Sequence, residues 1–178
     1  EESALYDSQS NGLAESAVKD AKDAVRTNLA CLVRRFGQEF TGEHPVLSWL
    51  VKYSVAMGNR YRRGPDGKKA YELRKGRRFA RALPYLAEQI LFMIPGVTKG
   101  VARVEPRWED GIFLGVSDRI DELYVGTGRG MHKVRTVRRR EATERFDLTF
   151  LNTVTARPWD GPKSAKEARV VFPDVSSP

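Results

Sequence analysis

The sequence contains a single cysteine, Cys31, and only two histidines, His44 and His132, among 178 residues. One cysteine cannot form a disulfide within the chain and suggests a reducing compartment, so we expect an intracellular location, nuclear or cytoplasmic. A structural zinc site needs four cysteine or histidine ligands, and three such residues therefore exclude a zinc finger. We expect Cys31 to be inert and neither histidine to act as a ligand or base.

Long apolar runs are also missing. The longest, residues 29–33 and 90–94, are far shorter than the about 20 residues of a transmembrane helix. No charged-then-apolar leader opens the chain, so we expect no signal peptide. With 40% hydrophobic and 30% charged residues, the composition is typical of a folded globular protein. The chain begins Glu1-Glu2 without a Met and soon reaches a helix signal, so we expect a piece of a longer protein.

Positive charge is concentrated in one segment. The chain carries 31 Lys and Arg against 23 Asp and Glu, a net charge of +8. Residues 60–81 contain ten basic residues and only two acids, so this segment alone carries +8 and the remainder sums to zero. A second stretch, 129–140, is basic without any acid. Such clusters indicate a polyanion-binding surface, although a solvated linker is the alternative for each. Nucleic acid is favoured over anionic membrane, because neither cluster lies on a helix with a broad apolar face.

Apolar spacing predicts helices in the first half of the chain and strands in the second. Ser10 or Asn11 is the expected N-cap of the first helix and Gly37 its C-terminal stop. Pro45 is expected in the first turn of the second helix. The expected helices cover residues 13–36, 45–59 and 70–75, and the expected strands cover 89–94, 111–117, 122–127 and 132–138.

The four expected strands suggest a small antiparallel sheet or barrel. We expect the aromatic residues Trp108, Phe113 and Tyr124 in its core rather than on a base-stacking surface. From about residue 152 onward, Pro, Ser and Lys indicate a linker or tail.

Several short motifs follow one another in a recognisable order. Ser10, Asn11 and Gly12 precede Glu15 at the start of the first helix, and Trp49 lies in the second. The tripeptide Tyr71-Glu72-Leu73 is followed by Gly76-Arg77, and residues 111–115 read Gly-Ile-Phe-Leu-Gly. In this order the chain resembles the integrases of copia-type LTR retrotransposons, which belong to retrovirus-related Pol polyproteins, over about residues 7–140. Ala70 stands where that family usually has Pro, and Val116 where it usually has Tyr.

The resemblance implies an α+β chain with four parts. Residues 1–59 would be the C-terminal helices of a ribonuclease-H-like integrase core, and 60–85 a basic connector. Residues 86–140 would be a small Src-homology-3-like antiparallel β-barrel, and 141–178 a flexible linker or tail. The two catalytic Asp of the family lie upstream of the first helix, so we expect this chain alone to be inactive.

The same resemblance implies that Glu15 is the last acid of an Asp-Asp-Glu triad and a ligand of Mg or Mn. Three carboxylates in such a triad hold two divalent ions, which stabilise the attacking and leaving oxygens of phosphoryl transfer. The alternative for Glu15 is a first-turn acid, which the helix dipole favours by about 0.3–1 kcal/mol.

Lys19, Lys22 and Arg26 follow Glu15 at offsets of four, seven and eleven residues, which places all four on one helix face. By resemblance, lysines at the first two offsets grip the terminal DNA of the element. The alternative is pairing of Glu15 with Lys19 along the helix, which is worth about 0.2–0.5 kcal/mol. The expected DNA contacts are Ser10, Asn11, Lys19, Lys22, Arg26, Arg60, Arg62, Arg63, Lys68, Lys69, Arg74, Lys75, Arg77, Arg78, Lys133 and Arg135.

We therefore expect a fragment of a retrotransposon integrase that binds element ends and target DNA. Its longer parent would be a homo-oligomer that performs DNA 3′-end cleavage and strand transfer. A non-catalytic nucleic-acid-binding module and a degenerate relic of an element are the alternatives. In the family, the apolar stripe of the first helix packs on a sheet that this chain lacks. We accordingly expect the N-terminal half to be loosely packed or self-associated.

Overall fold

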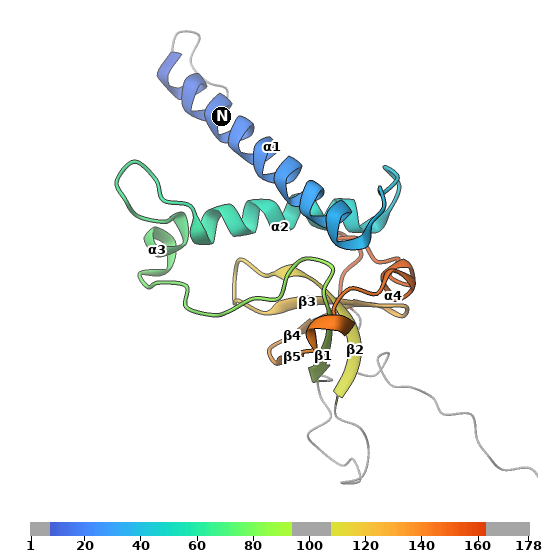
Figure 1. Cartoon of the computed structure of the whole chain (residues 1–178). Helices are drawn as coiled ribbons and strands as arrows, with labels where there is room; N and C mark the ends of the chain where they lie inside the picture. Colours follow the sequence, from blue (N-terminus) through green and yellow to red (C-terminus); the bar gives the residue numbers. More distant parts are fainter. Residues whose placement is uncertain (1–7, 94–107, 163–178) are drawn as a thin grey trace, which may run out of the picture.

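Helices and one antiparallel sheet make up the part of the chain that the structure, a computed structural model, describes: residues 8–93 and 108–162 (Figure 1). Within these ranges the chain is α+β, with four α-helices and an open sheet of five strands. The elements are α1 (Ser8–Phe36), α2 (Pro45–Tyr61), α3 (Ala70–Lys75), β1 (Gln89–Met93), β2 (Trp108–Val116), β3 (Leu123–Thr127), β4 (Gly130–Val134), β5 (Val137–Arg139), a 3₁₀ turn (Ala142–Glu144) and α4 (Leu148–Asn152).

The ends of α1 and α2 follow local chemistry. Gly37 adopts a φ of 67° directly after α1, as expected of a C-terminal stop. α2 begins at Pro45, and His44 caps it by accepting the Val46 N–H on its Nδ1 at 3.2 Å. α2 runs on to Tyr61, slightly further than predicted. α1 begins at Ser8, earlier than the sequence predicted.

The sheet has the strand order β4-β3-β2-β1-β5, with every pair antiparallel. The single run predicted over 132–138 is divided between β4 and β5, so there are five strands in the described residues instead of four. β4 and β5 are the two edges, yet only two residues separate them in sequence. Val134 and Val137 are three residues apart and hence within about 11 Å, whereas five flat strands would span about 19 Å. The sheet is therefore strongly curled, but its edges are not paired as in a closed barrel.

α2 and the sheet share one hydrophobic core. The Trp49 ring lies 5.4 Å from that of Tyr124, and the Tyr53 ring meets Phe113 edge-on at 6.3 Å. Phe113 and Tyr124 are buried as predicted, whereas Trp108 is half-buried. The sequence predicted a domain boundary between residues 59 and 86, but residues on both sides of it contribute to this core.

Residues 141–162 are packed structure rather than the expected flexible tail. Leu151, Val154 and Ala156 are buried, and Trp49 Nε1–H donates to the Ala156 carbonyl at 2.8 Å. A Cβ added to Gly126 would stand 2.6 Å from Val154 Cγ1, so this segment lies directly on β3. The remainder of the predicted tail, 163–178, lies outside the described residues.

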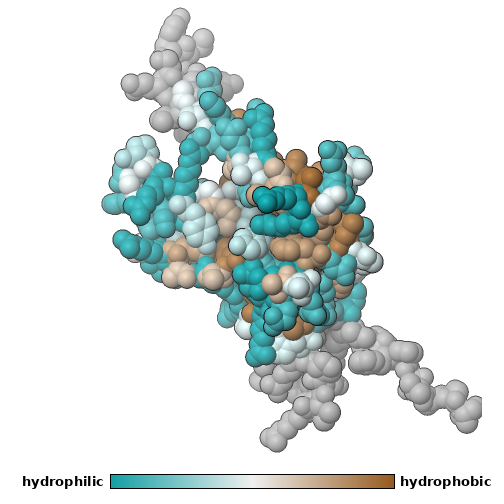
Figure 2. All heavy atoms as spheres, in the orientation of Figure 1, coloured by the Kyte–Doolittle hydropathy of each residue, from teal (hydrophilic) through white to brown (hydrophobic). Residues whose placement is uncertain are grey.

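The two halves of α1 differ in their surroundings. Leu32 is fully buried, and Val25, Leu29 and Phe36 pack against the core. Toward its N-terminus the helix extends beyond the body of the molecule (Figure 1), and Val18 is 53% exposed. In Figure 2, hydrophilic residues lie around the coloured margins of this face and hydrophobic residues gather near its centre. None of the described helices combines the length and apolar character that crossing a membrane requires.

Candidate nucleic-acid interface

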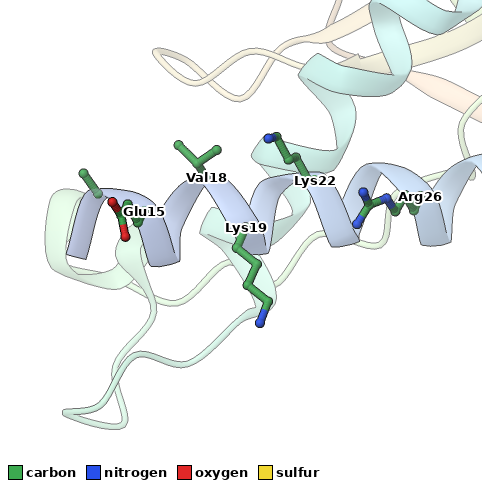
Figure 3. A pocket seen from close by; sticks show the side chains of 6 residues that line it. Glu15, Val18, Lys19, Lys22 and Arg26 are labelled. Carbon is green, nitrogen blue, oxygen red and sulfur yellow. The ribbon is translucent and has the colours of Figure 1, made fainter. Parts of the chain in front are cut away.

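One face of α1 carries Glu15 and the cations that follow it, all of them exposed. The helical repeat brings them together as the sequence predicted. Glu15, Lys19 and Lys22 form no ion pair with another described residue, whereas Arg26 Nη1 lies 3.0 Å from Asp23 Oδ1. This face is a shallow surface groove (Figure 3), lined by Ala14, Glu15, Val18, Lys19, Lys22 and Arg26.

The two polar residues expected just before the helix lie inside it. Because α1 begins at Ser8, both Ser10 and Asn11 belong to the start of the helix and not to a preceding loop. Asn11 is four residues from Glu15, so their backbone positions are one above the other on the same side of α1.

Glu15 does not belong to a metal site formed by the described residues. Within residues 8–93 and 108–162, no group of three or more His, Cys, Asp or Glu side chains is placed to hold a metal ion. Its neighbours in the groove are cations and apolar side chains, which are not ligands for Mg or Mn. Glu15 can thus supply one carboxylate, and the described residues alone do not fit a divalent ion.

Residues 62–69, here called the basic turn, form a short hairpin after α2. Arg63 and Lys69 make an isolated antiparallel bridge. The Gly64 N–H donates to the Lys68 carbonyl at 2.8 Å, and Asp66 Oδ1 accepts the Lys68 N–H at 3.1 Å. These bonds give the turn a defined shape although nearly all of it is exposed.

An ion pair joins the basic turn to α1, because Arg62 Nη1 lies 2.7 Å from Asp20 Oδ2. The turn is therefore held beside the N-terminal half of the helix. Lys69 is half-buried, with Nζ 3.9 Å from a carboxylate oxygen of Glu72. Arg63 and Lys68 are exposed and form no side-chain ion pair with another described residue.

The cations at the end of α3 have partners in the turn between β2 and β3, residues 117–122, here called the β2–β3 turn. Arg74 Nη2 donates to the Asp118 carbonyl at 2.8 Å, and Lys75 Nζ donates to the Arg119 carbonyl at 2.5 Å. The expected DNA contacts Arg74 and Lys75 thus bind the protein's own backbone.

The cations that follow α3 continue this contact. Arg77 Nη2 lies 3.2 Å from Asp121 Oδ2, and Arg81 donates to the carbonyls of Asp121 and Arg135. Arg78 differs, since its side chain is 91% exposed and its Nε lies 3.8 Å from a carboxylate of α3.

Arg60 is not a DNA contact, because its side chain is fully buried. It binds Asp118 Oδ1 at 3.0 Å, Asp121 Oδ1 at 3.3 Å and the Ser117 carbonyl at 2.9 Å. This arginine joins the end of α2 to the β2–β3 turn, and solvent-borne phosphate cannot reach it. The expectation for Arg60 was wrong, because a run of charge in sequence does not reveal which of its members face inward.

A sequence signal for the burial of Arg60 does exist. Arg60 follows Ala56 and Tyr53 at offsets of four and seven residues, so it continues the apolar stripe of α2. Its guanidinium lies 5.5 Å from the Tyr71 ring centre and 5.3 Å from that of Phe79. Two aromatic rings and two carboxylates thus enclose a charge that the run of basic residues, taken by itself, predicted on the surface.

The second basic stretch is also partly internal. Arg139 binds the fully buried carboxylate of Glu88 through two hydrogen bonds of 2.6 and 2.7 Å, and these bonds raise the pKa of Arg139 above its usual value. Arg140 donates from Nε and Nη2 to a single oxygen of Asp110, Oδ1, at 2.8 and 2.5 Å. Neither guanidinium is available to a phosphate without losing these bonds.

The two expected contacts in this stretch, Lys133 and Arg135, are both exposed. Lys133 Nζ lies 5.9 Å from the centre of the Tyr124 ring, and Arg135 Nε lies 3.3 Å from Glu122 Oε1. Lys133 projects from the edge strand β4.

Comparison of the chain with protein-family models, with curated proteins and with solved structures found no match.

Proposed function

We propose that this chain is a nucleic-acid-binding piece of a copia-type retrotransposon integrase, with the element's DNA ends and target DNA as partners. The observation that carries the proposal is a set of exposed cations without ion-pair partners among the described residues. Lys19 and Lys22 belong to it on α1, and Arg63 and Lys68 on the basic turn. Unpaired surface cations are the groups that phosphates attract, because binding releases the counterions of the nucleic acid.

The strand order supports the proposed fold relationship. A curled meander whose last strand returns to pair with the first is also the arrangement of Src-homology-3-like sheets. In this proposal α1 and α2 are the last helices of a ribonuclease-H-like core. The parent would be a homo-oligomer that is nuclear or cytoplasmic.

For a longer parent, we propose that Glu15 is one of three carboxylates that bind Mg or Mn for DNA cleavage and strand transfer. In the family that the chain resembles, the other two acids lie upstream of this helix, and the described residues form no metal site by themselves. That same observation favours a second candidate, a nucleic-acid-binding module without catalytic activity. Upstream sequence separates the two, because only the integrase requires an Asp on a strand followed by a second Asp before Glu15.

The proposal is tested by titrating labelled duplex DNA with the protein between about 50 and 200 mM salt. Contacts from Lys19, Lys22, Arg63 and Lys68, at about 0.9 each, predict a log–log slope of roughly 3–4. Duplexes of two unrelated sequences should bind almost equally, because phosphate contacts carry no sequence information. Binding that ignores salt over this range would contradict the proposal.

A further inference from the structure

The cations of residues 60–81 fall into two groups that the sequence does not distinguish. Arg74 and Lys75 are engaged with the β2–β3 turn, whereas Arg63 and Lys68 have no ion-pair partner among the described residues. Both pairs consist of one Arg and one Lys within the same basic segment. Their difference therefore lies in tertiary contacts and not in charge or composition.

The end of α3 is bonded to the β2–β3 turn. Arg74 and Lys75 donate to two successive carbonyls, those of Asp118 and Arg119, across 44 residues of sequence. Arg77 adds an ion pair with Asp121 in the same turn. A phosphate that recruited these cations would compete with the contacts that hold α3 in place, so part of the binding free energy would be lost.

The basic turn presents its cations from an ordered backbone, which favours the binding of an anion. Its backbone is held by the Arg63–Lys69 bridge and the bond from Gly64 to Lys68, so binding costs little backbone conformational entropy. Its only acid, Asp66, already accepts the Lys68 N–H. The ion pair between Asp20 and Arg62 places the turn beside α1.

We infer that the basic turn, and not the end of α3, is the element of this segment that contacts nucleic-acid phosphates, while Arg74 and Lys75 hold the β2–β3 turn. The inference rests on the proposed DNA binding. Phosphate backbone is the partner because the turn offers compact exposed cations and no apolar patch for a lipid surface.

Two matched double variants test this division. Arg63→Ala with Lys68→Ala, and Arg74→Ala with Lys75→Ala, each remove one Arg and one Lys. For the first, the log–log salt slope of duplex binding should fall by about 1.8, because each lost phosphate contact removes about 0.9. Its thermal midpoint should stay that of the wild type. For the second, the slope should fall by less than half as much, and the midpoint should drop by a few degrees. Circular dichroism establishes that both variants are folded.

The possible outcomes separate the inference from the function on which it rests. Wild-type protein that shows no salt-dependent DNA binding refutes the proposed function. Salt-dependent binding whose slope falls equally in both variants, or falls only with Arg74 and Lys75, overturns the inference alone. The inference is likewise overturned if Arg63→Ala with Lys68→Ala reduces binding to phosphatidylserine vesicles but leaves DNA binding unchanged. A folded Arg74→Ala, Lys75→Ala protein with wild-type stability contradicts the inference that these two residues hold the β2–β3 turn.

Discussion

At the scale of single residues, the carboxylate of Asp121 connects side chains that are distant in sequence. Its oxygens lie 3.3 Å from Arg60 Nη2, 2.7 Å from Tyr71 Oη and 3.2 Å from Arg77 Nη2. Asp121 itself has a φ of 56°, a left-handed conformation that costs energy in a residue other than glycine. The three partners therefore stabilise a turn whose local backbone is unfavourable.

Replacing Arg60 by Met removes the buried charge while keeping much of the side-chain length. We expect the free energy of unfolding to fall by about 3 kcal/mol, since breaking a buried ion pair leaves its carboxylates without a partner. The value lies at the low end for buried pairs, because the Asp118 side chain is 43% exposed and can be hydrated. Urea unfolding followed by circular dichroism measures the change.

Arg62→Met is the matched control for this substitution. Arg62 is 60% exposed and pairs with Asp20, also at the surface, so its loss should cost less than about 1 kcal/mol. Equal losses in the two variants would show that Arg60 is not the structural cation that its burial implies.

At the scale of elements, α1 is one helix in two environments. Its C-terminal half packs against α2 and the core, and Asn28 Nδ2 donates to Ser54 Oγ across the helix pair at 3.0 Å. The sequence predicted that the whole apolar stripe would lack a partner in this chain. The structure provides one for Val25, Leu29 and Leu32 but leaves Val18 exposed.

Truncating a side chain in each half of α1 should therefore change the free energy of unfolding by different amounts. Leu32→Ala removes a fully buried side chain and should lower the free energy of unfolding by about 2–5 kcal/mol. Val18→Ala, on the exposed half, should change it by less than about 0.5 kcal/mol. Chemical denaturation measures both. A large loss from Val18→Ala would instead reveal that a second copy or another segment covers this half of α1.

At the scale of the whole molecule, the proposed function combines a DNA-binding surface with one catalytic acid, Glu15. In the proposed parent, with both upstream Asp present, Glu15→Gln should reduce Mg-dependent strand transfer by at least about 100-fold, because the side chain keeps its size but loses the charge of a metal ligand. DNA binding should persist, since it depends on the cations. Single-turnover strand-transfer assays and binding titrations measure the two effects.

Lys19→Ala in the same parent serves as the comparison. It should weaken engagement of the DNA ends more than it slows the chemistry, because a lysine positions the phosphate backbone as a point charge. The present chain should show no metal-dependent cleavage. Strand transfer at the wild-type rate by the Glu15→Gln protein would end the integrase assignment of this residue, and the binding-module proposal would then lead.

Local patterns in the sequence determined the elements of this protein and the face on which Glu15 lies. Pro45 starts α2 and Gly76, with a φ of 66°, ends α3, because proline and glycine act on the backbone at their own positions. Helical spacing alone is enough to align Lys19 and Lys22 with Glu15. Most strands were predicted from short β-type runs between turn residues, whereas β4 and β5 were expected as one strand.

Tertiary structure decided which cations remain available to a partner, although helical spacing already places Arg60 on the apolar stripe of α2. Arg60 and Arg62 are neighbours in a charge run, yet one is fully buried between α2 and the β2–β3 turn and the other reaches Asp20 at the surface. Likewise Lys68 and Lys75 are the same residue type in the same basic segment, but it is Lys75 whose side chain donates a hydrogen bond to a carbonyl 44 residues away. The sequence likewise did not predict the packing of residues 148–156 on β3 or the open edges of the sheet. These features depend on contacts between segments far apart in sequence, and such contacts form only when the chain curls the sheet and closes one core around α2.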